Sequence, residues 1–293
     1  MKKKRIYPAW FILLPLAFYV LFFLLPALLG VCLSFTDWNV MSPVKGLHFA
    51  GLDNFIEIFT SDKNYLDGIE NTLVFTVVSN LVKLIPALFL AIMLQDALKG
   101  KGFFRTVFYL PSIIPFVIIG LIFRSVFNYE HGLLNVTLEA LHLEFLQQKW
   151  LSDLDIVWGS IFGVDAWKGI GYTMTIFLAG LNTIDRTYYE AARIDGAGFL
   201  QQLRHITLPM LSGAIMINLV FGMTYGLKVF DVIYVLTNGG PGHETEVMTT
   251  YAYQLYSTGQ YAMSTALNTI LLLITAAAGI LIVKYMSKKE VQQ

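Results

Sequence analysis

The hydrophobic residues of this chain gather into six long, almost uncharged runs that are separated by polar connections. A run of about 20 apolar residues has the length of a membrane-spanning helix. The pattern therefore predicts an all-α integral membrane protein. Its spans are expected at about Trp10–Leu33, Thr72–Leu94, Thr106–Phe127, Ile156–Leu181, Met210–Tyr234 and Thr265–Met286. With no periodic repeat and no low-complexity linker, we expect one membrane domain over residues 1–293.

The connection between the fourth and fifth runs, residues 182–209, is polar and charged but has the pattern of short helices. Asp185 is a typical helix N-cap residue, and Gly196 and Gly198 are expected to end the first helix because glycine readily adopts the left-handed conformation. A second short helix is expected at about Phe199–Ile206. Eight helical residues extend only about 12 Å, which is too short to cross a bilayer. Such a segment fits either the groove of a partner protein or the lipid head groups.

Composition and charge exclude several classes of function. The chain is 56% hydrophobic and only 14% charged, whereas soluble domains carry about 25% charged residues. A net charge of zero gives no support to nucleic-acid binding. The single cysteine, Cys32, cannot form an internal disulfide. The sequence has no phosphate-binding loop and no metal-ligand cluster, so we expect no cofactor in this chain and no ATP site.

The basic residues fall mainly on one side of the expected membrane. Six spans place both termini and residues 182–209 on the same side. The positive-inside rule makes this side the cytoplasm. The cytoplasmic set is Lys2–Arg5, Lys99, Lys101, Arg105, Arg186, Arg193, Arg204, Lys284, Lys288 and Lys289, against Lys45, Lys63 and Lys149 in the outer connections.

Three ionisable residues, Lys83, Asp165 and Lys168, lie well inside predicted spans. Each costs about 2.5–3.5 kcal/mol on insertion scales, so each needs a partner or water. Asp165 and Lys168 are three residues apart and could form an internal ion pair on one helix face. Lys83 could bond carbonyl groups freed near Pro86. The alternative is that these groups face a water-filled cavity and contact a solute.

A family resemblance is carried by residues 188–209. The string YEAARIDGAG followed by ITLP resembles the EAA loop of binding-protein-dependent ABC importer permeases, and in particular the sugar-transporting branch that includes the maltose and glycerol-phosphate permeases. Two further segments, GLDNF at 51–55 and TNGGP at 237–241, are similar to segments of the same branch. The residues that match the loop, and to which the resemblance assigns ATPase docking, are Glu190, Ala191, Ala192, Asp195, Gly196, Ile206, Leu208 and Pro209.

The resemblance implies a multi-pass subunit of a bacterial plasma membrane importer, with cytoplasmic termini and in contact with membrane lipid. Its implied partners are a second, homologous permease in a heterodimer, two copies of an ABC ATPase subunit that binds ATP and Mg²⁺, and an extracellular solute-binding protein. The chain itself is then not an enzyme. The loop is expected to carry the motion of the ATPase into the membrane.

The same resemblance implies where the solute binds. In the larger membrane subunit of the maltose transporter, the matching parts of the fourth span and of the span after the loop line the sugar site. An alignment on the EAA loop and TNGGP carries that site to Asp165, Lys168, Gly169, Tyr172, Gly222, Tyr225, Gly226 and Val229, and we add Trp167 and Lys83 as candidates. The chemistry differs from that subunit, since Lys168 replaces an apolar group. Lys83 and Lys168 thus lead to the hypothesis of an acidic or phosphorylated solute.

Two other functions remain open at this point. An ion-coupled secondary transporter could use Lys83 with Asp165 and Lys168, although such folds often contain inverted repeats and this interpretation leaves the EAA pattern unexplained. A non-transporting membrane scaffold is the third interpretation.

Overall fold

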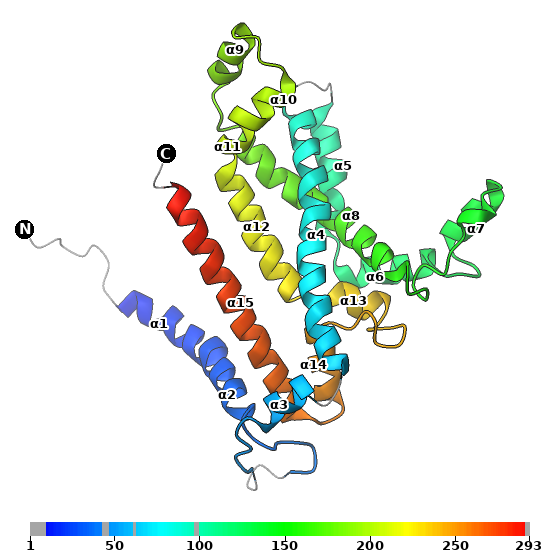
Figure 1. The fold of residues 1–293 in the computed structure, drawn as a ribbon, viewed down its shortest axis with the longest axis vertical. Coiled ribbons are helices and arrows are strands. Elements are labelled where there is room, and N and C mark those ends of the chain that lie inside the picture. The colour runs from blue at the N-terminus through cyan, green and yellow to red at the C-terminus, as the bar shows by residue number, and fades with distance from the viewer. Residues whose placement is uncertain (1–9, 43–46, 61–62, 97–99, 291–293) are drawn as a thin grey trace, which may run out of the picture. The chain divides into compact units, whose positions relative to one another are not determined.

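The structure is a computed structural model and describes residues 10–42, 47–60, 63–96 and 100–290. Every regular element in these ranges is a helix, and the β-type pairing found there is an isolated bridge between Thr36 and Phe49 (Figure 1). The all-helical class is therefore confirmed. Some of the basic residues used for the topology lie outside the described residues, namely Lys2–Arg5, Lys45, Lys99 and the side chains of Lys288 and Lys289.

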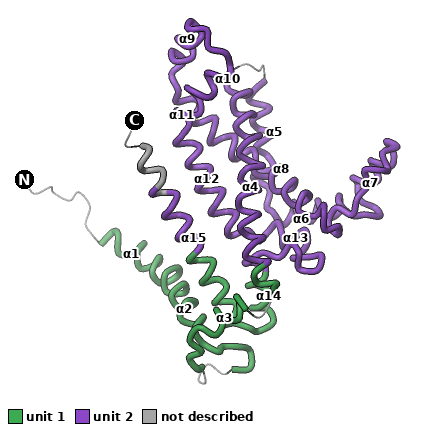
Figure 2. The backbone as a smooth tube through the Cα atoms, viewed as in Figure 1, with its two compact units in different colours: residues 1–66, 251–273 green, residues 67–250, 274–293 purple. Residues whose placement is uncertain are grey.

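The chain divides into two compact units, shown in different colours in Figure 2. Unit 1 comprises residues 1–66 and 251–273, and unit 2 comprises residues 67–250 and 274–293. Three helices contribute residues to both units, namely α4 (Lys63–Asp96), α14 (Met248–Ser257) and α15 (Tyr261–Glu290).

Unit 1 begins with the first apolar run, which forms one helical stretch. This stretch consists of α1 (Trp10–Tyr19), a π-helical turn η1 (Val20–Leu24) and α2 (Leu25–Leu33). The π turn directly precedes Pro26, whose ring cannot accommodate the normal bond to the preceding turn. The span Trp10–Leu33 has a mean hydropathy of 2.6 and 0% of it is buried within the chain. Its side chains are therefore available to lipid or to another subunit.

The GLDNF segment has a structural role in unit 1. Gly51 adopts a left-handed φ of 59° immediately before α3 (Asp53–Thr60). The Asn54 amide donates to the carbonyl oxygens of Ser34 and Thr36, both at 2.8 Å. These bonds satisfy the carbonyl of the α2 C-cap, Ser34, and that of Thr36 in the turn that follows the helix.

Unit 2 contains the remaining spans. Two apolar cores hold it together, one around Phe75, Ile161 and Ile233 and the other around Met174, Phe177 and Leu211. In Figure 1 the segment with α9 and α10 lies at one end of this unit and α13 at the other. Its helices, apart from those shared with unit 1, are α5 (Lys101–Ile113), α6 (Phe116–Val126), α7 (Leu133–Ala140), the 3₁₀ turn η3 (Glu144–Leu146), α8 (Val157–Leu181), α9 (Arg186–Ile194), α10 (Phe199–Gln202), the π turn η4 (Leu203–Thr207), α11 (Leu208–Met210), α12 (Ser212–Leu227) and α13 (Asp231–Leu236).

Two of the expected spans are not continuous helices. The third breaks between α5 and α6, whose axes differ by 95°. The cause is Pro115, because a proline disfavours helical dihedrals in the residue before it, and Ile114 is extended with φ −76° and ψ 131°. The fifth stops being helical after Leu227 and resumes at Asp231 in α13.

The count of six spans stays a prediction. Among the described residues, three helices are long and apolar enough to cross a membrane, and up to five if each of two bent pairs is one span. The three are Trp10–Leu33, Lys63–Gln95 and Tyr261–Ile282, and the bent pairs are α5 with α6 and Phe199–Met210 with α12. Helix α8 has the expected length but carries Asp165 and Lys168, which lower its hydropathy.

The polar connection forms the helices that its pattern predicts. Asp185 caps α9 by accepting from the Thr187 N–H at 3.0 Å. The backbone N–H and then the hydroxyl of Thr187 lower the pKa of the Asp185 carboxyl, so this cap is fully present above the ordinary pKa and is lost as the pH falls through the lowered one. Gly196 ends the helix with φ 79°. The expectation for Gly198 was wrong, because its φ of −72° is not left-handed and it begins α10.

The backbones of helices α5 and α8 are in close contact. A Cβ atom on Gly171 of α8 would lie 2.0 Å from the carbonyl oxygen of Phe108 in α5, whereas a Cβ on Gly159 of the same helix would meet nothing within 4 Å. A backbone carbonyl cannot move aside as a flexible side chain can. Gly171 is therefore required for the packing of the two helices.

We expect Gly171→Ala to lower the free energy of unfolding by about 1–3 kcal/mol, the usual cost of overpacking. Gly159→Ala is the matched control and should be neutral or slightly stabilising, since it removes a glycine from a helix. Thermal unfolding of the purified protein in detergent measures both changes. Equal stability of the two variants would contradict the backbone contact.

Candidate functional site

The centre of unit 2 contains a cavity of about 480 Å³, within the range of about 300–1,000 Å³ that is usual for small-molecule sites. Helices α4, α5, α6, α8 and α12 all contribute to its wall. Of the candidate solute residues, those that line it are Lys83, Asp165, Lys168, Gly169, Tyr172, Gly222 and Tyr225. The fourth and fifth runs therefore meet at one cavity, as the aligned site requires.

Three of the candidate residues lie elsewhere. Trp167 is 46% exposed and packs edge-on against Phe123. Val229 is buried in the apolar core around Phe75. Gly226 faces the backbone of Thr76, whose Cα would lie 2.6 Å from an added Cβ. None of these three is part of the cavity wall.

The Asp165 carboxylate is the most strongly bonded group in the cavity. The Lys83 ammonium lies 3.0 Å from its Oδ2, and the two side chains are only 9% and 2% exposed. The Ser79 hydroxyl donates to the same oxygen at 2.6 Å, and the Tyr225 hydroxyl donates to Oδ1 at 2.7 Å. Burying two charges costs several kcal/mol per ion and is tolerated when both are paired and hydrogen-bonded. This network satisfies that condition.

Lys168 has a different set of partners. Its ammonium donates to the carbonyl oxygens of Ser112 at 2.9 Å and Ile114 at 2.6 Å, with Pro111 at 3.4 Å. The Ser112 hydroxyl donates back to the Lys168 carbonyl at 2.8 Å. The Ser112 and Ile114 carbonyls have no helical N–H partner because α5 ends at the extended Ile114, whereas the Pro111 carbonyl also accepts from the Ile114 N–H at 3.3 Å. Lys168 thus replaces the helical N–H groups that the break in the third span removes.

The expected pairing of the charges was wrong in detail. Lys168 does not form the ion pair with Asp165, and Lys83 does not bond carbonyls near Pro86. Three-residue spacing places Asp165 and Lys168 on adjoining parts of α8, but α4 supplies Asp165 with a cation and the broken span supplies Lys168 with carbonyls. Both partners come from tertiary structure, which the spacing along one helix does not contain.

Several wall residues were not found from the sequence. They are Asn80, Leu84, Tyr109, Ser112, Phe116, Thr173, Asn218 and Phe221. Asn80 and Lys83 are three apart on α4, so a search for polar residues at helical spacing around Lys83 would have found Asn80. The residues from α5 and α6 could not be assigned without the 95° bend.

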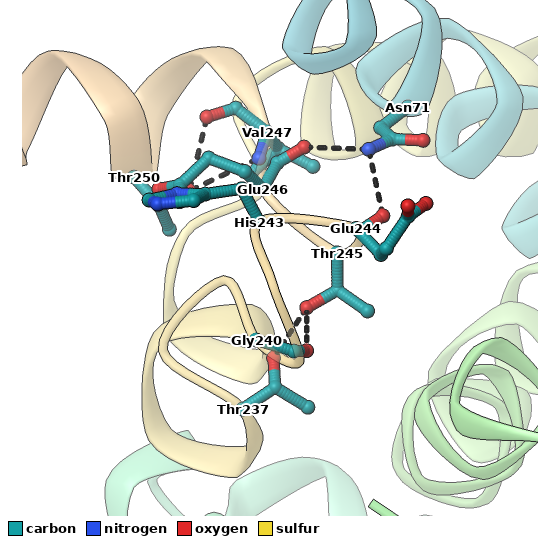
Figure 3. A network of polar contacts seen from close by, with 9 residues as sticks. All are labelled: Asn71, Thr237, Gly240, His243, Glu244, Thr245, Glu246, Val247 and Thr250. Atoms are coloured by element: carbon teal, nitrogen blue, oxygen red, sulfur yellow. Dashed lines mark hydrogen bonds and ion pairs between the residues drawn. The ribbon is translucent and has the colours of Figure 1, made fainter. Parts of the chain in front are cut away.

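The TNGGP segment belongs to a hydrogen-bonded loop rather than to the cavity (Figure 3). The Asn71 amide of α4 donates to the carbonyls of Glu244 and Glu246, both at 2.9 Å. The Thr245 hydroxyl donates to the Gly240 carbonyl at 2.6 Å, and His243 lies 3.0 Å from the buried Glu246 carboxylate. These contacts fasten residues 237–246 to the start of α4 in unit 2.

Separating the buried ion pair should destabilise the protein. Asp165→Asn leaves the Lys83 ammonium without a negative partner, and Lys83→Met leaves the Asp165 carboxylate without a positive one. Each substitution should lower the free energy of unfolding by about 3–5 kcal/mol. The double variant Lys83→Met, Asp165→Asn removes both charges and should lose less than the sum. Denaturation of the detergent-solubilised protein tests this double-mutant cycle. Strict additivity would show that the two groups are not coupled.

Comparison with known proteins identifies the family of the chain. Residues 72–290 match the family model described as the inner membrane component of binding-protein-dependent transport systems. A probable ABC transporter permease of Bacillus subtilis, YurN, is 35% identical and the alignment covers 97% of both chains. The multiple sugar-binding transport system permease MsmF of Streptococcus mutans is 33% identical, again over 97% of both.

A solved structure shares the fold. It is a bacterial ABC transporter involved in the import of the acidic polysaccharide alginate, with a TM-score of 0.81, 25% identity and coverage of 95% of this chain and 94% of that one. A second structure of the alginate transporter, in complex with its alginate pentasaccharide-bound periplasmic protein, aligns with a TM-score of 0.78. The chain therefore belongs to the inner membrane components of binding-protein-dependent transport systems, the permease subunits of ABC importers.

Proposed function

We propose that this chain forms half of a channel through which an oligosaccharide or a related solute is imported across the bacterial plasma membrane. As a permease subunit the chain is not an enzyme, and ATP is hydrolysed by a separate subunit. The observation that supports a solute site most directly is the central cavity, where aromatic and polar side chains from five helices converge. Sugars are recognised in such sites through ring faces and hydrogen bonds to their hydroxyl groups.

The proposed partners follow from the family. A solute-binding protein would deliver the sugar from outside, a second homologous permease would complete the channel, and two ATPase copies with ATP and Mg²⁺ would drive it. We place both termini and residues 182–209 in the cytoplasm, as the distribution of basic residues indicates. The sugar class is supported by the multiple sugar-binding transport system to which MsmF belongs and by the import of alginate by the solved transporter.

The segment from α9 to α10 is the proposed contact with the ATPase. Its apolar side chains point outward, with Ile194 86%, Phe199 65% and Leu200 73% exposed. Beside them a hollow of about 350 Å³ is lined by Ala192, Asp195, Gly196 and Ile206, among others. Exposed apolar groups next to a hollow are typical of protein–protein contacts. Of the eight residues assigned to docking, these four line the hollow.

Uptake into membrane vesicles tests the transport mechanism. We expect accumulation of the solute to require ATP on the cytoplasmic side together with the binding protein and to persist when ionophores collapse the ion gradients. A vesicle without ATP is the matched control. Uptake driven by an ion gradient alone would support the secondary transporter instead and would reject the proposed function.

Disruption of the turn between α9 and α10 should uncouple the permease from its ATPase. At Gly196, which has φ 79°, a Cβ is strained, so Gly196→Ala should shift the exposed apolar residues and lower ATP-driven uptake by about tenfold. Gly198→Ala is the control, because φ at Gly198 is −72° and nothing lies near an added Cβ. Glu190→Lys, which reverses a charge on α9, should also weaken co-purification with the ATPase. If the Gly196 and Glu190 variants both kept wild-type uptake and wild-type co-purification with the ATPase, the proposed docking role of this segment would be contradicted.

A further inference from the structure

The two lysine ammonium groups of the central cavity already bond to other groups of the protein. A lysine ammonium has three N–H donors, and those of Lys168 face the three carbonyls of Pro111, Ser112 and Ile114. Lys83 pairs with Asp165 at 3.0 Å and lies 4.3 Å from the centre of the Tyr225 ring. Its charge is therefore cancelled within the wall. An anionic solute would lose its hydration on entering this cavity and would find no uncommitted cation among the described residues of the wall to replace it.

The groups that remain available are neutral. The hydroxyls of Tyr109, Tyr172 and Thr173 line the cavity and make no hydrogen bond within the described part of the chain. The rings of Phe116 and Phe221 form apolar surfaces beside them. Hydroxyl groups both donate and accept, so this wall matches the hydroxyl groups of an uncharged carbohydrate.

Asn80 is placed to be the principal polar contact. Its Nδ2 donates to the Thr76 carbonyl at 2.7 Å, which fixes the side chain against α4. Its Oδ1 lies against Gly222 of α12, only 1.7 Å from where a Cβ atom would be. The Asn80 amide thus occupies the space that a side chain at position 222 would fill. Within the described residues, Asn80 Oδ1 accepts no hydrogen bond and the second N–H of Nδ2 donates none. Asn80 also lines the cavity, so both groups are available to a solute.

We propose, on the basis of the importer function proposed above, that Asn80 is a specificity-determining residue and that its amide and the neutral hydroxyls around it select an uncharged oligosaccharide over an acidic one. The lysines organise the wall and do not bind the solute. This replaces the expectation, drawn from Lys83 and Lys168 alone, of an acidic or phosphorylated solute.

The test uses a strain that lacks only this gene and is complemented with the wild-type chain or a variant. The strain itself then supplies all the natural partner subunits. Labelled sucrose, raffinose and maltotriose are the neutral probes, within a wider panel of uncharged saccharides, and trigalacturonate and glucose 6-phosphate are the anionic probes. We expect the wild-type chain to restore uptake of neutral saccharides only. Asn80→Ala should lower the maximal rate of neutral-saccharide uptake by about tenfold or more, with the amount of protein in the membrane and its co-purification with the ATPase preserved.

Three further variants separate recognition from packing. Asn268→Ala is the matched control, because the Asn268 amide makes the same bond to a carbonyl four residues earlier, at 3.0 Å, and does not line the cavity. Adding Gly222→Ser to Asn80→Ala places a hydroxyl near the vacated position and should recover part of the uptake rate, while Gly222→Ser alone should impair uptake because its Cβ collides with Asn80.

The outcomes are distinguishable. Uptake restored for anionic probes, or equal maximal uptake rates for the Asn80→Ala and Asn268→Ala chains, would overturn the inference while leaving the importer in place. Loss of the gene without effect on any saccharide would overturn the proposed function, and the inference with it. Neutral uptake that depends on Asn80 supports both.

Discussion

The structure of unit 2 depends on neutralising a carboxylate and two ammonium groups among apolar helices. Asp165 receives donors from Lys83, Ser79 and Tyr225, which joins α4, α8 and α12 around one point. A charge in this environment that lost its partner would be far more costly than a missing apolar contact. This electrostatic requirement therefore holds the three helices together at the cavity, in addition to the two apolar cores.

The second requirement is to satisfy backbone groups where a span is interrupted. Within a membrane, a free carbonyl has no water to accept from, so irregular backbone is tolerated only where protein groups replace the missing bonds. Lys168 supplies these bonds at the end of α5. The bend between α5 and α6 brings Tyr109 and Phe116 to the cavity wall. A side chain that looks like a solute ligand in the sequence is thus part of the scaffold that shapes the site.

Hydrophobic periodicity and helix caps were sufficient to predict much of this fold. Span four was expected at Ile156–Leu181 and α8 covers Val157–Leu181, and Asp185 caps α9 as expected. The partners of Lys83 and Lys168 could not be predicted, because they lie on other helices and depend on the break at Ile114. Asn80 could have been found from its helical spacing to Lys83, but its contact with Gly222 of α12 could not. Most of the residues that the resemblance assigned to the solute line the cavity. The resemblance could not show which polar groups of the cavity already bond to other groups of the protein.

The contact of Gly171 with the Phe108 carbonyl has a mechanical consequence. Close backbone contact leaves two helices little room to slide past one another, so we expect α5 and α8 to move as one unit during transport. For the proposed importer, we expect the conformational change of transport to occur where the backbone is already irregular, at Ile114–Pro115 and at residues 228–230 between α12 and α13. Ser112 and Phe116, on either side of the first of these positions, and Tyr225, shortly before the second, line the cavity. The expected hinges therefore lie next to the proposed solute site.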